Sequence, residues 1–438
     1  MAKLNIRNRN AGKVDKDGKP KPPNWEYRFE GAKVDGKRKQ ITKAGFRTKK
    51  EAEIAGTKAQ AEYNNAGLSF EPSEMSYADY LEYWFDNYVK TSCKYNTQIA
   101  YNTIIENHLK PALGMYKLSA LSAMQLQEYV NQKFTSGLKK TTLKNIITVI
   151  TGSLSYAVVP AQLLQGSPAA YIRYPKLDSN RSDVNRTVIS LEDFNRMLER
   201  FPTGNVFRYA LLIGMHTGLR IGEVFALTWD DIDFTEKTLT VNKQIYKRNY
   251  GMDVRKAMKS KNKREEKSAW YFGDTKTPAS KRTIKIGDTL ISELRQFKKM
   301  QLEQQLQYGE YYSQTYTKEE KDEKGNTIHR LIDVECTVPV SLPKVNLVMR
   351  RENGEYMSKD SFKYASRIIH YELGITFNFH SLRHTHATML IESGVSPKAV
   401  QARLGHDKIE TTMQTYVHNT EVMEQDAVDV FEKAVNIE

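Results

Sequence analysis

The chain has 438 residues, which is long enough for two or three domains. It carries 66 Lys and Arg against 52 Asp and Glu, a formal charge of +14, and such an excess favours a polyanionic partner, usually DNA or RNA. The only two cysteines, Cys93 and Cys336, exclude a disulfide framework and favour a reducing, cytoplasmic setting. No apolar run approaches the roughly 20 residues of a membrane helix, and the charged first residues have no signal-peptide core, so we expect neither a membrane span nor export.

Residues 1–70 predict a small basic domain made of strands and one helix. They hold 17 Lys and Arg and 8 Asp and Glu, a local net charge of 17 − 8 = +9. Residues 25–29 alternate like a half-buried strand, Asp35-Gly36 is a hairpin signal, residues 38–42 read as the returning strand, and residues 49–64 as a helix. Such a sheet could read a DNA groove or be merely a solvated basic surface. Its candidate DNA-binding side chains are Arg28, Arg38 and Lys39.

Residues 72–175 predict an all-helical domain. We expect helices over 77–88, over 96–108 with its end before Pro111, and over 141–158. The last of these carries five apolar residues on one face, namely Ile146, Ile147, Ile150, Leu154 and Ala157. Cations at its start oppose the helix dipole and suit an external phosphate better than helix stability. They are Lys139, Lys140 and Lys144.

The polar residues 176–185 read as a linker. A third domain is expected over 186–420, where Ser190 and Asp193 resemble a capping box that opens its first helix. The fold class is therefore multidomain α+β: a small three-stranded sheet plus helix, a helical domain, and a mixed, mainly helical domain with a small antiparallel sheet. An acidic tail helix over 421–438, with six acidic residues against one lysine, could dock on a basic surface of this chain or of a neighbour.

Within the third domain the sequence predicts helices first, strands around 231–286, and helices again from about residue 358. Residues 301–335 carry no clear pattern. Residues 246–270 hold 9 Lys and Arg and 3 Asp and Glu, a net of 9 − 3 = +6, and we interpret them as a hairpin extension that contacts DNA. Its candidate DNA ligands are Lys247, Arg248, Lys261, Lys263 and Arg264.

Two of the clusters suited to catalysis come early in this domain. Thr217-Gly218-Leu219-Arg220-Ile221-Gly222-Glu223 places Arg220 at a glycine-marked helix start, with Glu223 on the same helix face. Lys276 lies in Thr275-Lys276-Thr277-Pro278-Ala279-Ser280, a turn between two strand-like runs. The lysine is therefore expected near the tip of a hairpin.

Two further clusters follow towards the end of the chain. His380-Ser381-Leu382-Arg383-His384-Thr385-His386 gathers imidazoles around Arg383, and Leu404-Gly405-His406 precedes Tyr416 by ten residues. Taken alone, Tyr416 fits a core position at helical spacing from other apolar residues. The histidine pair at 380 and 384 is spaced to bind zinc, although Arg383 would place a fixed cation beside the metal. Each arginine, like Lys276, could also be an ordinary surface residue.

Together, these side chains supply every role of metal-free phosphoryl transfer. Guanidinium groups grip the non-bridging phosphate oxygens bidentately and stay charged. A lysine can give a proton to the leaving alkoxide, and a histidine can accept the proton of the tyrosine. A phenol of pKa about 10 needs such a cationic neighbourhood to become an effective nucleophile.

The order of these motifs over residues 186–418 resembles the tyrosine-recombinase signature. The matching positions are Arg220 with Gly222-Glu223, Lys276, His380-x-Leu382-Arg383, Leu404-Gly405-His406 and Tyr416. Residues 72–175 resemble the family's helical core-binding domain, and residues 1–70 the three-stranded arm-binding domain of phage and conjugative-transposon integrases. The interval between Lys276 and His380 is longer than a minimal family member requires.

The resemblance implies one group of residues that holds the scissile phosphate. Arg220 and Arg383 would clamp it, and His406 would donate a hydrogen bond to it. Glu223 would support the site.

It also implies a route for protons and electrons. Tyr416 would attack and form a 3′-phosphotyrosine, His380 would act as general base, and Lys276 as general acid toward the 5′-oxygen. The family uses no metal and no nucleotide cofactor, because the phosphotyrosine bond conserves the energy of the broken strand.

The function that the resemblance implies is integration and excision of a mobile element, from a phage or a conjugative transposon, by site-specific recombination. The enzyme would act in the bacterial cytoplasm as a tetramer on core-type and arm-type sites in double-stranded DNA, with exchange of the C-terminal tail between subunits and the help of an accessory excision factor. Three alternatives stay open: a type IB topoisomerase with the same chemistry, a non-catalytic DNA-binding regulator on the same scaffold, and a zinc-dependent nuclease.

Overall fold

The computed structural model describes residues 4–15, 18–34, 37–64, 74–175, 187–249, 268–275 and 277–410. For 31–34, 37–39 and 61–64 it describes the backbone only. The chain folds as two compact units, 1–182 and 183–438, which are described separately.

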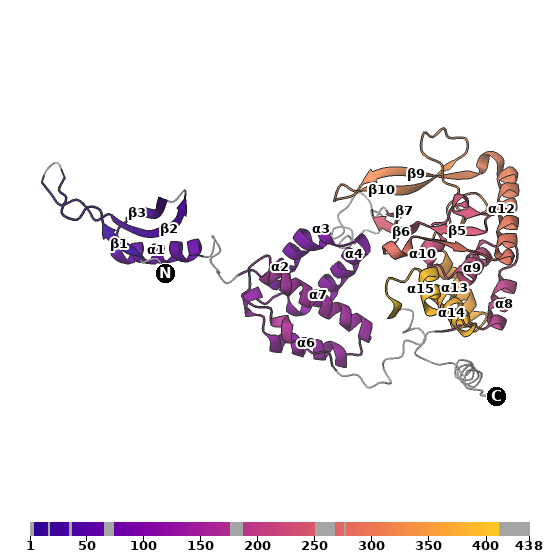
Figure 1. The fold of residues 1–438 in the computed structure, drawn as a ribbon, viewed down its shortest axis with the longest axis horizontal. Helices are drawn as coiled ribbons and strands as arrows, with labels where there is room; N and C mark the ends of the chain where they lie inside the picture. The colour runs from indigo at the N-terminus through magenta and orange to yellow at the C-terminus, as the bar shows by residue number, and fades with distance from the viewer. Residues whose placement is uncertain are drawn as a thin grey trace, which may run out of the picture. The chain divides into compact units, whose positions relative to one another are not determined.

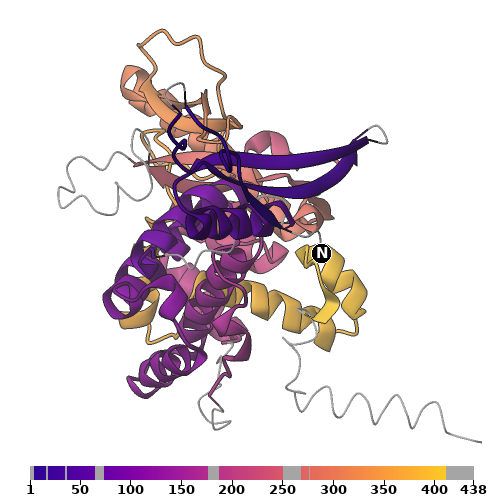
Figure 2. The same ribbon diagram turned by 90° about the vertical axis from the view of Figure 1, so that its left-hand side faces the viewer.

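The N-terminal unit begins with a three-stranded antiparallel sheet in the order β1-β2-β3, with helix α1 packed on β2 (Figures 1 and 2). Tyr27 and Phe29 on β2 are buried, and a Cβ on Gly56 of α1 would lie 2.8 Å from the Tyr27 Cβ, so glycine lets the helix approach the sheet closely. The expected strands and helix are confirmed. The elements are β1 (Asn5–Asn8), β2 (Trp25–Val34), β3 (Lys37–Phe46) and α1 (Lys49–Asn64).

Residues 74–175 contain only helical elements and connections. Two long helical runs each contain a π-helical turn, and the expected apolar face of α7 is fully buried. The elements are α2 (Tyr77–Trp84), η1 (Phe85–Val89), α3 (Lys90–Ser92), α4 (Tyr95–Ile104), η2 (Ile105–Leu109), α5 (Lys110–Leu113), η3 (Leu118–Ala120), α6 (Ala123–Thr135), α7 (Lys140–Val158) and η4 (Pro168–Tyr171).

The expected end of the second helix before Pro111 is wrong, because the helical run continues through Pro111 to Leu113. The amide of Lys110 donates to the carbonyl of Ile105, five residues back, so the helix is already widened into a π-turn where it meets the proline. Proline has no N–H to place, and it stands among the first residues of α5, where a missing donor does least harm.

The second unit starts with α8, whose N-terminus is capped by the Ser190 hydroxyl accepting the Asp193 amide at 3.0 Å. The helices at the start, the strands over about 231–286 and the helices from α13 onward are confirmed, but helix α12 and two further strands, which the sequence did not predict, lie between them (Figure 1). The elements are α8 (Leu191–Arg200), α9 (Val206–Thr217), α10 (Ile221–Val224), η6 (Trp229–Asp231), β4 (Ile232–Asp233), β5 (Thr238–Val241), β6 (Lys243–Asn249), β7 (Ser268–Asp274), η7 (Pro278–Ser280), β8 (Arg282–Lys285), α12 (Asp288–Tyr308), η8 (Gly309–Tyr311), β9 (Ser313–Lys321), β10 (Thr327–Glu335), α13 (Phe362–Tyr371), α14 (Phe379–Glu392) and α15 (Pro397–Leu404).

The two strand-like runs that flank Lys276 do not pair as the expected hairpin, because β7 and β8 belong to different sheets; Lys276 itself lies outside the described residues. Strand β6 pairs with β7 up to Lys243↔Asp274, and β5 pairs with β8 from Val241↔Arg282. On one side of this ribbon only Asn242 separates β5 from β6, whereas on the other side β7 ends at Asp274 and β8 begins at Arg282. The 3₁₀ turn Pro278–Ser280 within the loop carries a proline, which removes one backbone donor and interrupts pairing.

Residues 301–335, which carry no clear pattern in the sequence, form the end of α12 and the hairpin β9–β10. The hairpin joins the outer edge of the β6–β7 ribbon through β10, giving a four-stranded sheet in the order β6-β7-β10-β9. The length of the interval before His380 therefore comes from an added hairpin that extends an existing sheet.

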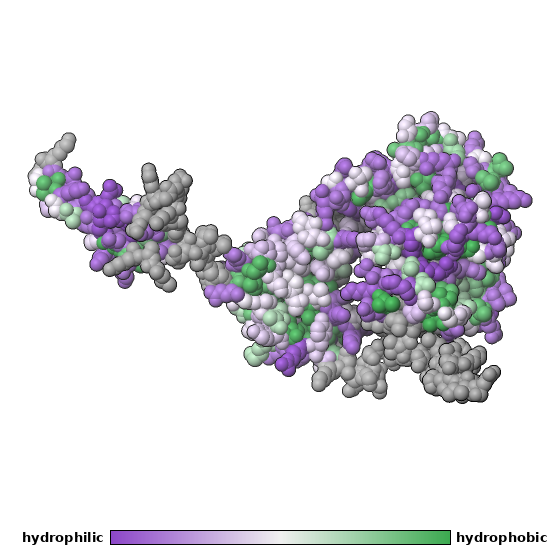
Figure 3. Space-filling view, viewed as in Figure 1, coloured by the Kyte–Doolittle hydropathy of each residue, from purple (hydrophilic) through white to green (hydrophobic). Residues whose placement is uncertain are grey.

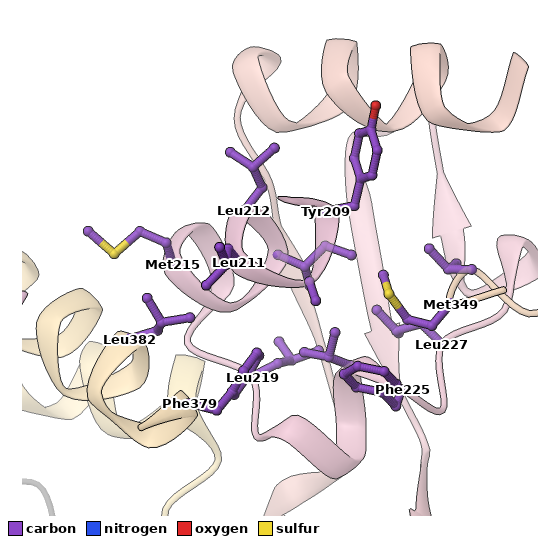
Figure 4. Close-up of a cluster of buried hydrophobic side chains, with 14 of the residues drawn as sticks. Tyr209, Leu211, Leu212, Met215, Leu219, Phe225, Leu227, Met349, Phe379 and Leu382 are labelled. Atoms are coloured by element: carbon purple, nitrogen blue, oxygen red, sulfur yellow. The ribbon is translucent and has the colours of Figure 1, made fainter. Parts of the chain in front are cut away.

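The core of this unit is built around α9, which is buried over most of its length (Figure 4). Leu382 and Phe379 of α14 lie against it, and a Cβ on Gly214 would come within 2.8 Å of Leu382 Cδ1 and 2.9 Å of Phe379 Cζ. This close approach fixes α14, and with it His380 and Arg383, beside the C-terminal end of α9.

The face of the second unit that Figure 3 presents is mainly hydrophilic, with apolar side chains in small separate groups. Among the described residues, no helix combines the length and the apolar character needed to cross a bilayer.

Candidate active site

Arg220 stands at the junction of two helices. Helix α9 ends at Gly218, in the left-handed conformation with φ of 66°, and α10 begins after Arg220, whose backbone is extended. A Cβ on Gly218 would lie 2.6 Å from Leu404 Cδ2 and 2.9 Å from His386 Cδ2, so only glycine fits this turn. The sharp connection directs the Arg220 side chain towards α15.

Glu223 holds Arg220 in place from within α10. Its Oε1 accepts Arg220 Nη1 at 2.7 Å and its Oε2 accepts the Arg220 amide at 3.1 Å. Burial alone would raise the pKa of Glu223, but Arg282, Arg220 and the Arg220 amide together hold it below its ordinary value. The carboxylate is 2% exposed and is kept ionised by its cations, as the predicted supporting role requires.

Arg383 is buried in α14, with 2% of its surface exposed. Its Nη1 donates to the carbonyl of Gly218 at 2.8 Å and its Nη2 to the carbonyl of Leu404 at 2.7 Å. The guanidinium therefore bridges the end of α9 and the end of α15, and its orientation is fixed by two charge-assisted hydrogen bonds.

The turn after α15 brings the two predicted arginines together. Gly405 ends the helix in the left-handed conformation, with φ of 67°. Its carbonyl accepts Arg220 Nη2 at 3.5 Å, while the preceding carbonyl, that of Leu404, accepts Arg383 Nη2. Arg220 and Arg383 thus meet at the turn that leads into His406, and their roles toward a phosphate stay predictions.

His406 follows this turn directly and is half-buried. Burial, together with the cations of Arg383 and Arg220, lowers the pKa of His406 to about 3. The imidazole is therefore neutral at physiological pH, so one ring nitrogen carries a proton to donate while the other can accept.

His380 is exposed at the first turn of α14, whose N-terminus is capped by Asn378. The centroid of its ring lies 4.5 Å from that of His384, with the two rings 88° apart. Within the described ranges, no set of three His, Cys, Asp or Glu side chains is arranged to hold a metal ion.

Lys276 and Tyr416 lie outside the described residues, so their predicted roles stay predictions. The loop that carries Lys276 packs against the histidine turn: a Cβ on Gly405 would lie 2.9 Å from Ala279 O and 3.0 Å from Ser280 Cα. The Ser280 hydroxyl is within hydrogen-bond distance of Gly405 O at 3.4 Å and of Arg220 Nη1 at 3.3 Å.

The sequence did not single out Arg282 or Arg403, which are both part of this cluster. Arg403 donates from Nε to His386 Nε2 at 3.0 Å, from Nη1 to Lys285 O and from Nη2 to His216 O. Burial, helped by Arg403, lowers the pKa of His386 to about 4 and keeps it a neutral acceptor. Nothing in the local sequence distinguishes these arginines from solvated ones, because their partners are distant along the chain.

The candidate DNA-binding side chains differ in their exposure and in their distance from carboxylates. Lys139, Lys140 and Lys144 are exposed at the start of α7. Lys247 is half exposed, 3.9 Å from Asp360, while Arg248 is 12% exposed and 3.8 Å from Asp322. Arg28 is partly buried on β2. The structure does not describe the side chains of the other candidates, which are Arg38, Lys39, Lys261, Lys263 and Arg264.

Three segments of the chain match known protein families. Residues 188–422 match the phage integrase family, residues 76–134 the N-terminal SAM-like domain of phage integrases, and residues 13–63 an arm DNA-binding domain.

Relatives match over most of their length. The chain is 27% identical over 390 residues to a protein named tyrosine recombinase XerC-like from Caldanaerobacter subterraneus, covering 87% of this chain and 89% of the relative. It is 24% identical over 398 residues to the integrase of Staphylococcus phage L54a, covering 86% and 98%.

Solved structures share the fold. The integrase of transposon Tn1549 bound to transposon right-end DNA has a TM-score of 0.57 at 17% identity, over 83% of this chain and 100% of that one. A lambda integrase tetramer bound to a Holliday junction has a TM-score of 0.52 at 17% identity, over 95% and 97%.

Proposed function

Since the chain belongs to the phage integrase family, we propose that Tyr416 is the nucleophile with which it cuts and rejoins DNA. The resemblance drawn from the motifs is confirmed, and the protein is a site-specific recombinase of the tyrosine type. The observation that carries the assignment of residues is the convergence of Arg220 and Arg383 on the turn that ends in His406.

In the proposed reaction, the phosphoryl group passes directly from the 5′-oxygen of the DNA strand to the oxygen of Tyr416. The Tyr416 oxygen bonds to phosphorus as the P–O5′ bond breaks, the tyrosine proton passes to His380, and the 5′-oxygen leaves with a proton from Lys276. Arg220 and Arg383 would hold the non-bridging oxygens.

One feature of the site, the neutral imidazole of His406, suits the charge of the phosphate. His406, neutral because its pKa lies near 3, would donate a hydrogen bond without adding a third cation. The reverse attack by a 5′-hydroxyl of another strand reseals the DNA, so neither a metal nor a nucleotide is needed.

The proposed substrate is double-stranded DNA with two kinds of site. Residues 13–63, which match an arm DNA-binding domain, would hold arm-type sequences. Residues 72–175, with the exposed lysines at the start of α7, and residues 186–420 would clamp the core site.

We further propose a tetramer on DNA, in line with the lambda integrase tetramer on a Holliday junction. Residues 421–438, outside the described ranges, would pass between subunits. The reaction would integrate and excise a phage or conjugative element in the cytoplasm of its bacterial host, with an accessory factor favouring excision.

A nicked suicide substrate tests this assignment. The wild-type protein should form a covalent adduct with DNA that survives denaturation, whereas Tyr416→Phe should bind the same DNA and form none. Adduct formation by Tyr416→Phe would refute the assignment of the nucleophile, and failure of the wild type on every cognate site would favour a regulator. Persistence of the adduct in a chelator would count against a zinc nuclease.

A two-site assay separates recombination from topoisomerase action. A recombinase should exchange strands between two cognate sites, and a type IB topoisomerase should relax supercoiled plasmid without exchanging them. The arm-type domain is a specific reason to expect exchange, because it offers a second DNA-holding surface.

A further inference from the structure

Arg282 is a buried cation among the described residues around the site, and it has no assigned role. Only 7% of its side chain is exposed. Its three kinds of donor reach three separate segments: Nη2 lies 3.1 Å from Glu223 Oε2, Nη1 2.8 Å from Ser280 O, and Nε 2.7 Å from Arg403 O.

Each of these three acceptors leads directly to a residue of the proposed machinery. Glu223 holds Arg220 through a side-chain and a backbone hydrogen bond. Ser280 closes the loop that begins beside Lys276, and Arg403 lies three residues before His406 at the end of α15. One planar group therefore spans the three parts of the site that come from different regions of the chain.

The energetics favour a role in geometry over one in stability. Burial lowers the pKa of Arg282 while Glu223 raises it, so the charge is sustained by its partner at a desolvation cost. A buried ion pair is on average no more stabilising than apolar residues of the same size, and such pairs are best attested as devices that fix register. A guanidinium fixes three directions at once, which the point charge of a lysine cannot do.

We propose that Arg282 is a positioning residue that sets Arg220, the loop of Lys276 and the turn of His406 in register for strand cleavage. This inference rests on the proposed function of those residues. In this role Arg282 acts through Glu223 and through the backbone of the two other segments.

The test compares Arg282→Lys and Arg282→Gln with Arg208→Lys. Arg208 forms a similar half-buried ion pair, 3.0 Å from Glu293, between α9 and α12, so it controls for loss of a buried arginine away from the site. Single-turnover cleavage is measured on DNA-saturated complexes, and the unfolding midpoint of each variant is recorded.

The substrates are a suicide duplex with a normal phosphodiester and the same duplex with sulfur in place of the bridging 5′-oxygen. A thiolate leaves without a proton donor, so the second substrate does not depend on Lys276. Both Arg282 variants should cleave the normal substrate about 10²-fold more slowly, the usual cost of a misplacement near 1 Å. They should recover part of that loss on the sulfur substrate, and Arg208→Lys should show neither effect.

Cleavage of the normal substrate by a folded Arg282 variant at the rate of Arg208→Lys would overturn the proposal, as would an equal loss on both substrates. If Arg282→Lys does not fold, the rates of cleavage of the normal and the sulfur substrate are compared for Arg282→Gln, which keeps an amide donor but no charge. Absence of any adduct with the wild type would instead count against the proposed function.

Discussion

Arg383 and Arg220 donate to adjacent carbonyl oxygens of one turn: Arg383 Nη2 lies 2.7 Å from Leu404 O, and Arg220 Nη2 lies 3.5 Å from Gly405 O. Two guanidinium groups so placed repel each other, and the carboxylate of Glu223 and the backbone oxygens offset that repulsion. The turn after α15 thus supplies the acceptors that orient both guanidinium groups. Changes to this turn should lower both the stability of the fold and the rate of DNA cleavage.

Replacement of Arg383 by lysine should cost both stability and activity. A single ammonium cannot serve Gly218 O and Leu404 O in their present directions, and an unsatisfied buried carbonyl costs about 1–3 kcal/mol. Urea unfolding should show a loss of that size, and cleavage should fall below detection. Arg196→Lys is the control, because Arg196 also donates to a carbonyl, that of Leu373 at 2.8 Å, but is 45% exposed; it should change stability by less than about 0.5 kcal/mol. Equal losses in the two variants would contradict the expectation.

Gly405→Ala should displace the histidine turn. An L-residue at φ of 67° costs about 1–3 kcal/mol, and here the added methyl would also lie 2.9 Å from Ala279 O. The matched change is Gly394→Ala, at φ of 80° with nothing within 4 Å of the new methyl. Both variants should lose stability, and only Gly405→Ala should lose cleavage. Normal cleavage by Gly405→Ala would show that the turn does not set the site.

The stability of the second unit should rise with pH across the mildly acidic range. The pKa values of His386 and His406 in the folded protein, about 4 and about 3, lie below the unfolded value near 6.5. Between these limits the unfolded chain binds more protons, so stability grows as pH rises towards 6.5 and levels off above it. Urea unfolding at about pH 5 and about pH 7.5 measures this, and His386→Gln, which keeps an acceptor for Arg403, should reduce the difference. A stability that falls as pH rises over this range would contradict it.

The basic segment between β6 and β7 can be removed without breaking their register. Asn249↔Ser268 is the last pair of the ribbon, so an Asn-Gly turn in place of residues 250–267 would close it as a hairpin. The segment holds seven Lys and Arg and three Asp and Glu, a net of 7 − 3 = +4. Its removal should weaken DNA binding and flatten the plot of log affinity against log salt by about 0.9 per lost phosphate contact. A variant of full length with these cations changed to glutamine should behave alike; unchanged binding in both would refute the DNA-contact interpretation.

Much of the site could be predicted because its motifs are local. Arg220 with Glu223, and His380 with Arg383, are separated by a single helical turn, and Gly405 marks the end of α15 just before His406. Spacing of this kind is visible in the sequence. The same holds for α7, whose buried apolar face repeats at helical spacing although lysines and no side-chain cap stand at its start.

What the sequence could not supply is long-range pairing. The hairpin β9–β10 is recognisable only once β10 is seen beside β7, and the sequence between β7 and β8 looks like a hairpin turn until β8 is seen beside β5. Arg282 resembles any arginine of a surface strand, because its burial depends on Glu223 and Arg403, which lie far away along the chain.

Because β7 and β8 are not joined as a hairpin, the alignment of the strands and the placement of the segment that carries Lys276 depend on opposite sides of the ribbon. Because β5 and β6 run on almost without a break, both sheets keep their alignment whatever the other side of the ribbon does between Asp274 and Arg282. Changes of length there would alter the reach of Lys276, the proposed general acid, together with the contacts of Ser280 with Arg220 and Gly405. The reach of Lys276 is therefore coupled to the orientation of Arg220, whereas the strand pairing within each of the two sheets is independent of both.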